Sequence, residues 1–206
     1  SYFQGSSIVD ESDYPIDYVD WLEADEFANL LSELDGLAPC YDPSSAYTPY
    51  GLYSGNNYYD CPGYRLPTQA EWVYAAHSGS AEEIWTENGG GPPVDLAHLS
   101  YVDDGTGVLL ASLSWFRNTS GFRSQRVGQL SPNGFGLYDM YGNMIEWTND
   151  WFVSYSAFPS SYVDPVGLNG SSKIITGSCW SEYPDNVSNE RVSNYNPTSS
   201  YWDIGF

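Results

Sequence analysis

Two segments of this chain, residues 63–72 and 132–147, constrain its fold more than any other part of the sequence. The first contains Thr68 and Glu71 at the spacing of a capping box, in which each side chain accepts a hydrogen bond from the other residue's amide. A helix is therefore expected to begin here and to end near Gly79, because glycine readily adopts the left-handed conformation that closes a helix. The second segment combines turn-forming glycines with aromatic residues.

Several short strands are expected around and after the second segment. Residues 144–152 are rich in Trp and typical of a buried strand, and residues 173–176 are expected to form another, preceded by a turn at residues 169–170. A closing strand is expected near residues 203–206, and Val127 is a candidate for a short strand upstream. The rest of the last 25 residues is expected to form turns.

A further helix is expected near the start of the chain. Asp20 and Glu23 form a second capping box, and Gly36 stands at the position of a helix stop. Over residues 21–34, large apolar side chains recur at helical spacing and are expected to form one face of the helix. That apolar face comprises Phe27, Leu30, Leu31 and Leu34.

The 206 residues are enough for one domain with a sizeable core, and the sequence shows no internal repeat and no clear linker. Residues 1–6 resemble the remnant of a protease-cleavage tag and are set apart from the fold. Residues 7–206 are predicted to form a single α+β domain with two helices, short strands and long irregular loops. Residues 39–60 are expected to be a loop or an irregular hairpin.

The cysteines leave two interpretations open. Cys40, Cys61 and Cys179 are an odd number and match no zinc-binding spacing. Cys40 and Cys61 flank a stretch rich in Tyr, Gly and Ser, so a disulfide between them is one interpretation. Two unpaired, semi-buried thiols are the other, and the sequence favours this second one.

A large excess of negative charge limits the partners of the protein. Its 27 acidic and 6 basic side chains give a formal net charge of −21. Such a surface repels phosphate backbones and anionic lipids, so we expect no nucleic-acid binding. No apolar run approaches the roughly 18 residues that cross a bilayer, so we expect no membrane insertion.

With these residues the chain resembles the formylglycine-generating enzyme (sulfatase-modifying factor) family. The matching motifs are Gly-Tyr-Arg-Leu-Pro-Thr-Gln-Ala-Glu-Trp at 63–72, the run at 132–147 that ends in Gly-Asn-Met-Ile-Glu-Trp, Gly-Ser at 177–178 and Gly-Phe at 205–206. The resemblance implies a C-type-lectin-like fold of the formylglycine-generating-enzyme type. Because one fold supports many functions, the resemblance does not by itself assign an activity.

The same resemblance implies where catalytic chemistry would lie. In the family, two cysteines bind copper(I), a soft ion that prefers thiolates. The matching positions here are Ser181 and Asn186, and Cys179 is a single thiol two residues too early. One thiolate cannot form a two-sulfur site, so no copper is expected and no residue is assigned as catalytic. Two alternatives stay open: a copper-dependent oxidase that acts on a protein cysteine, and a degenerate accessory member of the family.

Family members also bind calcium, which implies a structural calcium site in this chain. The matching ligands are the side chains of Asp139 and Glu146 and the main-chain carbonyls of Gly142 and Met144. Hard oxygen ligands on a tight glycine turn suit this ion. The alternative is that Asp139 caps a turn and that Glu146 pairs with a buried partner.

The segment 178–203 has an unusual composition, because 15 of its 26 residues are Ser, Asn, Tyr or Trp. Tyr and Trp give rigid contact area and Ser and Asn give adaptable hydrogen bonds, as in antibody paratopes. With its Ile-Gly-Phe ending, the segment resembles the variable region of diversity-generating-retroelement variable proteins, which implies a non-catalytic ligand-binding surface. The side chains expected to meet the ligand are Cys179, Trp180, Ser181, Tyr183, Asp185, Asn194, Tyr195, Ser199, Tyr201 and Trp202.

That resemblance also implies a class of partner and a location. The expected partner is a protein or a cell-surface ligand, and the expected location is the surface of a cell or a virion. Aromatic side chains are expected to be the anchors of the contact, because Trp and Tyr carry much of the binding energy at protein interfaces.

Overall fold

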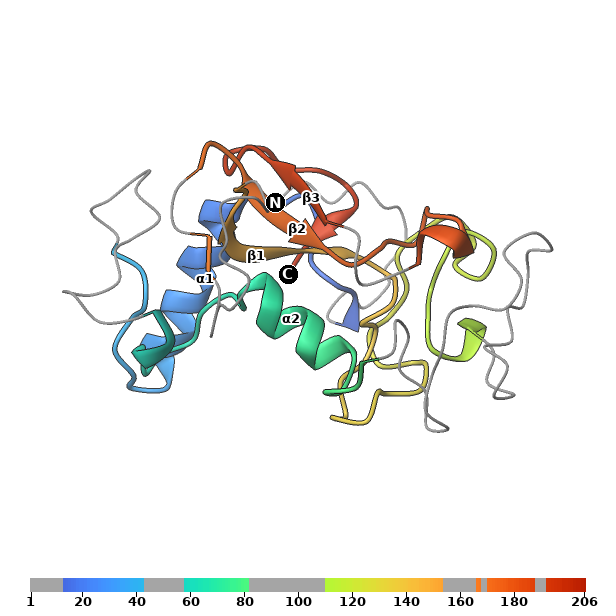
Figure 1. Ribbon diagram of the computed structural model, residues 1–206, viewed down its shortest axis with the longest axis horizontal. Coiled ribbons are helices and arrows are strands. Elements are labelled where there is room, and N and C mark those ends of the chain that lie inside the picture. The colour runs from blue at the N-terminus through green and yellow to red at the C-terminus, as the bar shows by residue number, and fades with distance from the viewer. Residues whose placement is uncertain (1–12, 43–57, 82–109, 154–165, 168–169, 188–191) are drawn as a thin grey trace.

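The computed structural model describes residues 13–42, 58–81, 110–153, 166–167, 170–187 and 192–206 (Figure 1). The predicted tag remnant, residue 169 of the predicted turn and most of the predicted loop at residues 39–60 fall outside these ranges. Within them, two α-helices and a small mixed sheet are joined by long irregular connections, which confirms the predicted α+β class. None of the helices described is long and apolar enough to cross a membrane.

The sheet has the strand order β3-β2-β1-β4. Its strands are β1 (Ile145–Trp151), β2 (Lys173–Thr176), β3 (Val192–Tyr195) and β4 (Ile204–Gly205). β2 pairs antiparallel with both β1 and β3, whereas β4 runs parallel to β1. The predictions of β1, β2 and β4 are confirmed, but β3 lies where only turns were expected.

The helix α2 (Gln69–Ala76) begins at its predicted capping box. The Glu71 amide donates to the Thr68 hydroxyl at 3.1 Å, and the Thr68 amide donates to the Glu71 carboxylate at 2.8 Å. At the other end, Gly79 takes a φ of 73° and its amide donates to the Tyr74 carbonyl at 3.0 Å, so the predicted stop is confirmed. The helix lies beneath β1 and β2 (Figure 1).

The helix α1 (Trp21–Leu34) also begins at its predicted capping box. Most of its predicted apolar face is exposed, however: Phe27, Leu30 and Leu34 are 48%, 54% and 75% exposed, whereas Leu31 is partly buried. The residues that α1 buries are Trp21, Ala24, Ala28 and Ser32. These mostly small side chains let the chain approach closely, and a Cβ at Gly63 would collide with the Ala38 carbonyl.

Three 3₁₀ turns complete the described elements: η3 (Tyr58–Asp60), η4 (Leu110–Ser112) and η6 (Pro184–Asn186). The prediction of a strand at Val127 is wrong, because this residue lies in a turn. Its amide donates to the Asp13 carbonyl at 2.8 Å, so a tertiary contact rather than a strand ladder satisfies the backbone there.

The main core lies between α1 and the sheet, where Trp147, Ile175 and Ile204 pack with Trp21. A second cluster lies beneath the irregular connections and consists of Leu110, Leu113, Phe116, Tyr141 and Val187. The irregular half of the molecule therefore has a core of its own, which fixes the connections that carry the candidate site.

One core residue carries an amino group. Lys173 of β2 is completely buried, and its Nζ lies 3.7 Å from the centroid of the Trp21 ring and 4.4 Å from that of Trp151. The same nitrogen donates a hydrogen bond to the Asn149 carbonyl at 2.6 Å. Burial lowers the pKa of Lys173 to about 7, against the opposing effect of nearby carboxylates.

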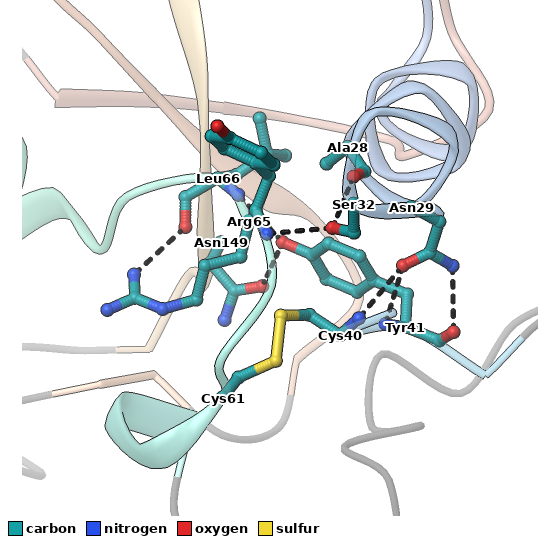
Figure 2. The surroundings of a disulfide bond; sticks show 10 residues. Ala28, Asn29, Ser32, Cys40, Tyr41, Cys61, Arg65, Leu66 and Asn149 are labelled. Carbon is teal, nitrogen blue, oxygen red and sulfur yellow. Dashed lines mark hydrogen bonds between the residues drawn. A yellow bond between two sulfur atoms is a disulfide. The ribbon is translucent and has the colours of Figure 1, made fainter. Parts of the chain in front are cut away.

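A disulfide joins Cys40 to Cys61, so the favoured prediction of two unpaired thiols is wrong (Figure 2). The Asn29 side chain of α1 accepts hydrogen bonds from the amides of Cys40 and Tyr41 at 3.0 and 2.9 Å. The Tyr41 hydroxyl in turn accepts from the Leu66 amide at 2.9 Å. The bridge thus lies in a hydrogen-bonded corner that connects α1 with the segment leading into α2.

Candidate ligand-binding face and calcium pocket

The predicted ligand-contacting residues gather around two aromatic pairs. The rings of Trp180 and Trp202 lie 4.9 Å apart between centroids, and those of Tyr195 and Tyr201 lie 4.7 Å apart. Tyr195 comes from β3, whereas the other three rings come from irregular segments on either side of it. We call the surface formed by these four rings together with Ser181, Tyr183, Asn194 and Ser199 the C-terminal face.

The members of the C-terminal face differ in their access to solvent. Tyr183 and Trp202 are 50% and 41% exposed, and Asn194 is also exposed. Trp180, Ser181, Tyr195, Ser199 and Tyr201 are partly buried. The two tyrosines of the second pair pack against the main core, so only part of each ring is offered to a ligand.

Two of the predicted contact residues stand apart. Cys179 is completely buried, which corrects the expectation that it is displayed with the others. Its sulfur lies 3.2 Å from the Ser181 hydroxyl, and burial raises the pKa of its thiol. The backbone of Asp185 belongs to η6, and its side chain is outside the description.

Main-chain hydrogen bonds hold the C-terminal face in place. β3 is paired with β2 along its whole length, in the register Lys173 with Tyr195 and Thr176 with Val192. Beyond the strand, the Tyr18 amide donates to the Tyr201 carbonyl at 3.1 Å. Because backbone groups make these bonds, the side chains of the face are left to make other contacts.

Asn143 fastens the C-terminal face to the rest of the molecule through all of its polar groups. Its carbonyl accepts from the Trp180 amide at 3.0 Å and its own amide donates to the Trp115 carbonyl at 2.9 Å. Its side-chain oxygen accepts from the Gln125 amide at 2.8 Å, and its side-chain nitrogen donates to the Gln125 carbonyl at 3.1 Å. The residue is buried at a φ of 68°, a conformation that Asn tolerates better than most residues.

The two positions that match the family's copper ligands contain no thiol. The Ser181 hydroxyl contacts Cys179, and the Asn186 amide donates to the Glu182 carboxylate at 2.9 Å. The chain has three cysteines, and two of them are used by the disulfide. Cys179 is therefore the single free thiol, and a site that needs two thiolates cannot be assembled within this chain.

The four predicted calcium ligands line one pocket. Asp139, Gly142, Met144 and Glu146 surround a cavity of about 200 Å³, together with Pro15, Val127, Tyr138, Asn143 and Phe206. Gly142 is required at its position, because a Cβ there would collide with the Trp115 carbonyl. Asp139 takes a φ of 59°, which turns the chain sharply at the pocket wall. The sequence prediction thus identified four residues that the fold brings together.

The electrostatics of this pocket fit a cation with oxygen ligands. One oxygen of Asp139 accepts from the Gly128 amide at 2.8 Å, while its Oδ1 is buried with no hydrogen-bond partner. One oxygen of Glu146 accepts from the Trp72 indole at 2.8 Å. Burial raises the pKa of both carboxyl groups, and the charge of Asp139 raises the pKa of Glu146 further. Within the described part of the chain, neither carboxylate has an ion-pair partner.

The donor set is compatible with calcium in particular. Its two carboxylates and two main-chain carbonyls are hard oxygen donors, which calcium prefers. If calcium is bound, Asp139 and Glu146 would hold it through their side chains and Gly142 and Met144 through carbonyls. The ion would then neutralise two carboxylates that otherwise repel each other.

Three residues near the C-terminal face were not singled out from the sequence. Asn143 stands inside a recognised motif, but its spacing to Gln125 and Trp180 gives no local signal. Arg117 and Phe122 belong to a stretch without periodicity, and only the structure places Arg117 against the rings of Phe122 and Tyr183.

Two capped helices, a four-stranded mixed sheet and long ordered connections define the formylglycine-generating-enzyme-like form of the C-type-lectin-like fold. A solved structure with this arrangement is that of Treponema denticola variable protein 1, which superposes with a TM-score of 0.73 at 28% sequence identity. The match covers 100% of this chain and 75% of that chain. The chain belongs to the sulfatase-modifying factor enzyme 1-like domain family, whose profile matches residues 2–206.

Relatives of this chain carry the names of different kinds of protein. The formylglycine-generating enzyme of Streptomyces coelicolor is 31% identical over 158 residues, which cover 70% of this chain and 46% of that protein. Chaperone protein LppX of Paenibacillus barcinonensis is 31% identical over 147 residues, which cover 66% of this chain and 52% of that protein. The chain thus spans about half the length of these relatives.

Proposed function

We propose that this protein is a non-catalytic binding protein that presents the C-terminal face to a ligand. The observation that supports this most directly is the content of segment 178–203. Where the family's copper ligands are expected, Ser181 and Asn186 replace cysteines, and around them exposed aromatic side chains are held by main-chain hydrogen bonds. Rigid aromatic rings on an ordered backbone lose little entropy on binding. The likeness to a variable protein supports the same proposal.

The alternative within the family is a copper-dependent oxidase, and the arrangement of cysteines weighs against it. A linear two-thiolate site needs two free sulfurs, but Cys179 is the single free thiol of the chain. Burial raises the pKa of that thiol, which disfavours the thiolate that a soft metal requires. The residues at the family's copper positions offer hydroxyl and amide groups instead.

The proposed partner is a protein or a cell-surface ligand, and the proposed location is the surface of a cell or virion. The Cys40–Cys61 disulfide supports a location outside a reducing compartment, because such bonds persist mainly where the surroundings are oxidising. The net charge of −21 supports a partner that is neither a nucleic acid nor an anionic lipid.

A two-part experiment tests this proposal. Purified protein would first be screened against an array of extracellular protein domains, and each hit would be measured by surface plasmon resonance. For a true ligand, the variant Trp202→Ser should weaken binding by about tenfold or more, because exposed aromatic anchors carry much of the energy at interfaces. The matched control is Phe135→Ser, which removes a ring that is 50% exposed, against 41% for Trp202, and that packs against Tyr74 instead.

The second part tests the oxidase directly. Copper(I) titration, followed by an oxidation assay on a cysteine-containing peptide, should show neither stoichiometric copper binding nor turnover. Tight copper binding together with formation of an aldehyde product would contradict the proposal. Loss of ligand binding in both Trp202→Ser and Phe135→Ser would contradict the assignment of the C-terminal face.

We further propose that the pocket at Asp139 and Glu146 binds a structural calcium ion. Chelation should then destabilise the protein, because a ligand that binds only the native state stabilises it by about 2.7 kcal/mol at a hundredfold excess over its Kd. For a domain of this size, that corresponds to a fall in Tm of roughly 5–10 °C. Differential scanning calorimetry with calcium or with EGTA measures the difference, and an Asp139→Asn variant should reduce it.

The calcium effect should also depend on pH. Without the ion, burial raises the folded-state pKa of Asp139 and Glu146. The stability that these two carboxyl groups contribute is therefore fully present at a pH below their unfolded-state pKa. It is lost as the pH rises through their folded-state pKa. Calcium needs both groups ionised. The difference in Tm between calcium and EGTA should therefore grow from pH 5 to pH 7.5, and a difference that is zero at both values would exclude the site.

A further inference from the structure

A basic group lies beside the C-terminal face and outside segment 178–203. The guanidinium carbon of Arg117 lies 5.0 Å from the centroid of the Phe122 ring and 4.8 Å from that of the Tyr183 ring. The Phe122 and Tyr183 side chains are 61% and 50% exposed, and Arg117 is partly buried between the segments that carry them. We call these three residues the arginine–aromatic cluster.

Hydrogen bonds fasten this cluster to the C-terminal face. The Arg117 amide donates to the Glu182 carbonyl at 2.8 Å, and the Ser120 hydroxyl donates to the Trp180 carbonyl at 2.8 Å. In Figure 1 the yellow-green segment that contains residue 117 accordingly lies beside the orange-red segment around η6. The cluster is therefore joined to the part of the C-terminal face that carries Trp180 and Tyr183.

The backbone holds Phe122 outward in an unfavourable conformation. Phe122 takes a φ of 62° directly after Gly121 at 65°, and such a value is rare for a bulky residue. The Phe122 amide donates to the Ser120 hydroxyl at 3.2 Å, which helps to fix this turn. An exposed aromatic ring on a strained backbone stabilises nothing in the core, and strain of this kind concentrates at functional sites.

The charge of Arg117 has a different environment from those of Arg65 and Arg126. Acidic side chains outnumber basic ones by 27 to 6, and two of the arginines use carboxylate partners: Arg65 pairs with Glu71 at 2.7 Å and Arg126 with Asp13 at 3.5 Å. Arg117 makes no ion pair with any residue in the described ranges. The adjacent Glu182 carboxylate accepts a hydrogen bond from the Asn186 amide instead. Among the described residues, Arg117 thus offers a guanidinium that contacts two aromatic rings and no carboxylate.

We propose that the arginine–aromatic cluster binds a carboxylate side chain of the protein ligand, as a fixed anchor next to the C-terminal face. A guanidinium that contacts rings through its faces keeps its N–H groups for a bidentate carboxylate. The two rings exclude water from that contact, which strengthens it. Arg117 and Phe122 lie outside segment 178–203, whereas Tyr183 lies within it, so the guanidinium and one of its two rings do not belong to that segment. This inference rests on the proposed binding function.

A nuclear magnetic resonance titration tests the anchor without a known ligand. The probe is the blocked peptide acetyl-Leu-Glu-Leu-amide, and its neutral counterpart is acetyl-Leu-Gln-Leu-amide. The glutamate peptide should shift the Nε–H resonance of Arg117 in a saturable way, whereas the glutamine peptide should not. The shift should be absent in Arg117→Gln and weakened in Phe122→Ser, and it should persist in Arg126→Gln, which removes an arginine that already has a partner. Equal shifts with both peptides, or none with either, would overturn the proposal.

The same variants separate this inference from the proposed function. For any protein ligand found by the array, Arg117→Gln should weaken binding by about tenfold or more, as expected for a charged anchor. If that ligand binds Arg117→Gln and the parent protein equally, the anchor is wrong and the binding function stands. If the glutamate peptide binds but the array yields no ligand that depends on Trp202, the anchor stands and the proposed function fails. Unchanged Tm values for the variants establish that the comparison is between folded proteins.

Discussion

Replacing Lys173 with alanine should destabilise the protein by about 3–5 kcal/mol, the cost usually seen when one partner of a buried charged arrangement is removed. For a domain of this size, the loss corresponds to a fall in Tm of roughly 6–20 °C. Three interactions disappear together: the hydrogen bond to the Asn149 carbonyl and the contacts of the ammonium group with Trp21 and Trp151. The substitution also leaves a cavity between two large rings.

A methionine variant distinguishes the contribution of side-chain packing to stability from the contribution of the charge. Lys173→Met nearly preserves the volume of the side chain, so its cost should be clearly smaller than that of Lys173→Ala. Urea unfolding of both variants, followed by tryptophan fluorescence, measures the difference. Equal stability of Lys173→Ala and the parent protein would show that the buried lysine is not important for the fold.

The difference in stability between the parent protein and Lys173→Met should change with pH in a definite direction. Burial lowers the folded-state pKa of Lys173 to about 7, below the ordinary lysine value of 10.5, so between these values the unfolded chain binds more protons than the folded one. Stability contributed by Lys173 therefore rises with pH in this window. Relative to Lys173→Met, the parent protein should gain stability between pH 7.5 and pH 9.5. A constant difference over that range would contradict the lowered pKa.

Loss of the Cys40–Cys61 disulfide should have the second-largest effect. The bridge closes a loop with a sequence separation of 21 residues, for which the chain-entropy estimate is about 3 kcal/mol. The Cys40→Ser/Cys61→Ser double variant should therefore unfold roughly 6–12 °C below the parent protein. Dithiothreitol should lower the Tm of the parent protein by a similar amount and leave the double variant unchanged.

Thiol counting provides an independent control for the disulfide. Unfolded, unreduced protein should react with one equivalent of Ellman's reagent, from Cys179, and reduced protein should react with three. Three equivalents without reduction would show that the bridge does not form. A Cys179→Ser variant should give no reaction before reduction and should still respond to dithiothreitol.

The local signals of the sequence predicted local structure well. The capping boxes at Asp20 and Thr68 located both helix starts, because a cap requires two polar side chains at a fixed spacing. The Trp-rich run located β1. In contrast, β3 was missed, because the polar residues of this strand resemble a turn and only its pairing with β2 selects the extended form.

Features that depend on tertiary packing were harder to predict. The apolar stripe of α1 follows helical spacing, but the small residues opposite it pack more closely against the Gly63 segment. The pairing of Cys40 with Cys61 depends on the corner built around Asn29 and Tyr41, which spacing alone does not reveal.

The candidate sites also divide into features that local sequence signals predict and features that depend on tertiary packing. The four predicted calcium ligands lie within eight residues of one motif, so the sequence could place them together, and the structure has them around one pocket. Arg117 is far in sequence from Tyr183, and its stretch has no recognisable pattern. Cys179 reads as part of a polar surface segment, but the first turn after β2 directs it inward.

The hydrogen bonds of Asn143 connect the pocket at Asp139 and Glu146 with the Trp180 segment of the C-terminal face. One residue lines the calcium pocket and also holds the Trp180 amide and the Gln125 backbone. If the pocket binds a cation and the C-terminal face binds a ligand, the two sites are joined through the hydrogen bonds of Asn143. By thermodynamic reciprocity, whatever factor calcium adds to ligand affinity, the ligand adds to calcium affinity. The local calcium concentration would then set how tightly the protein holds its partner, without any contact between the ion and that partner.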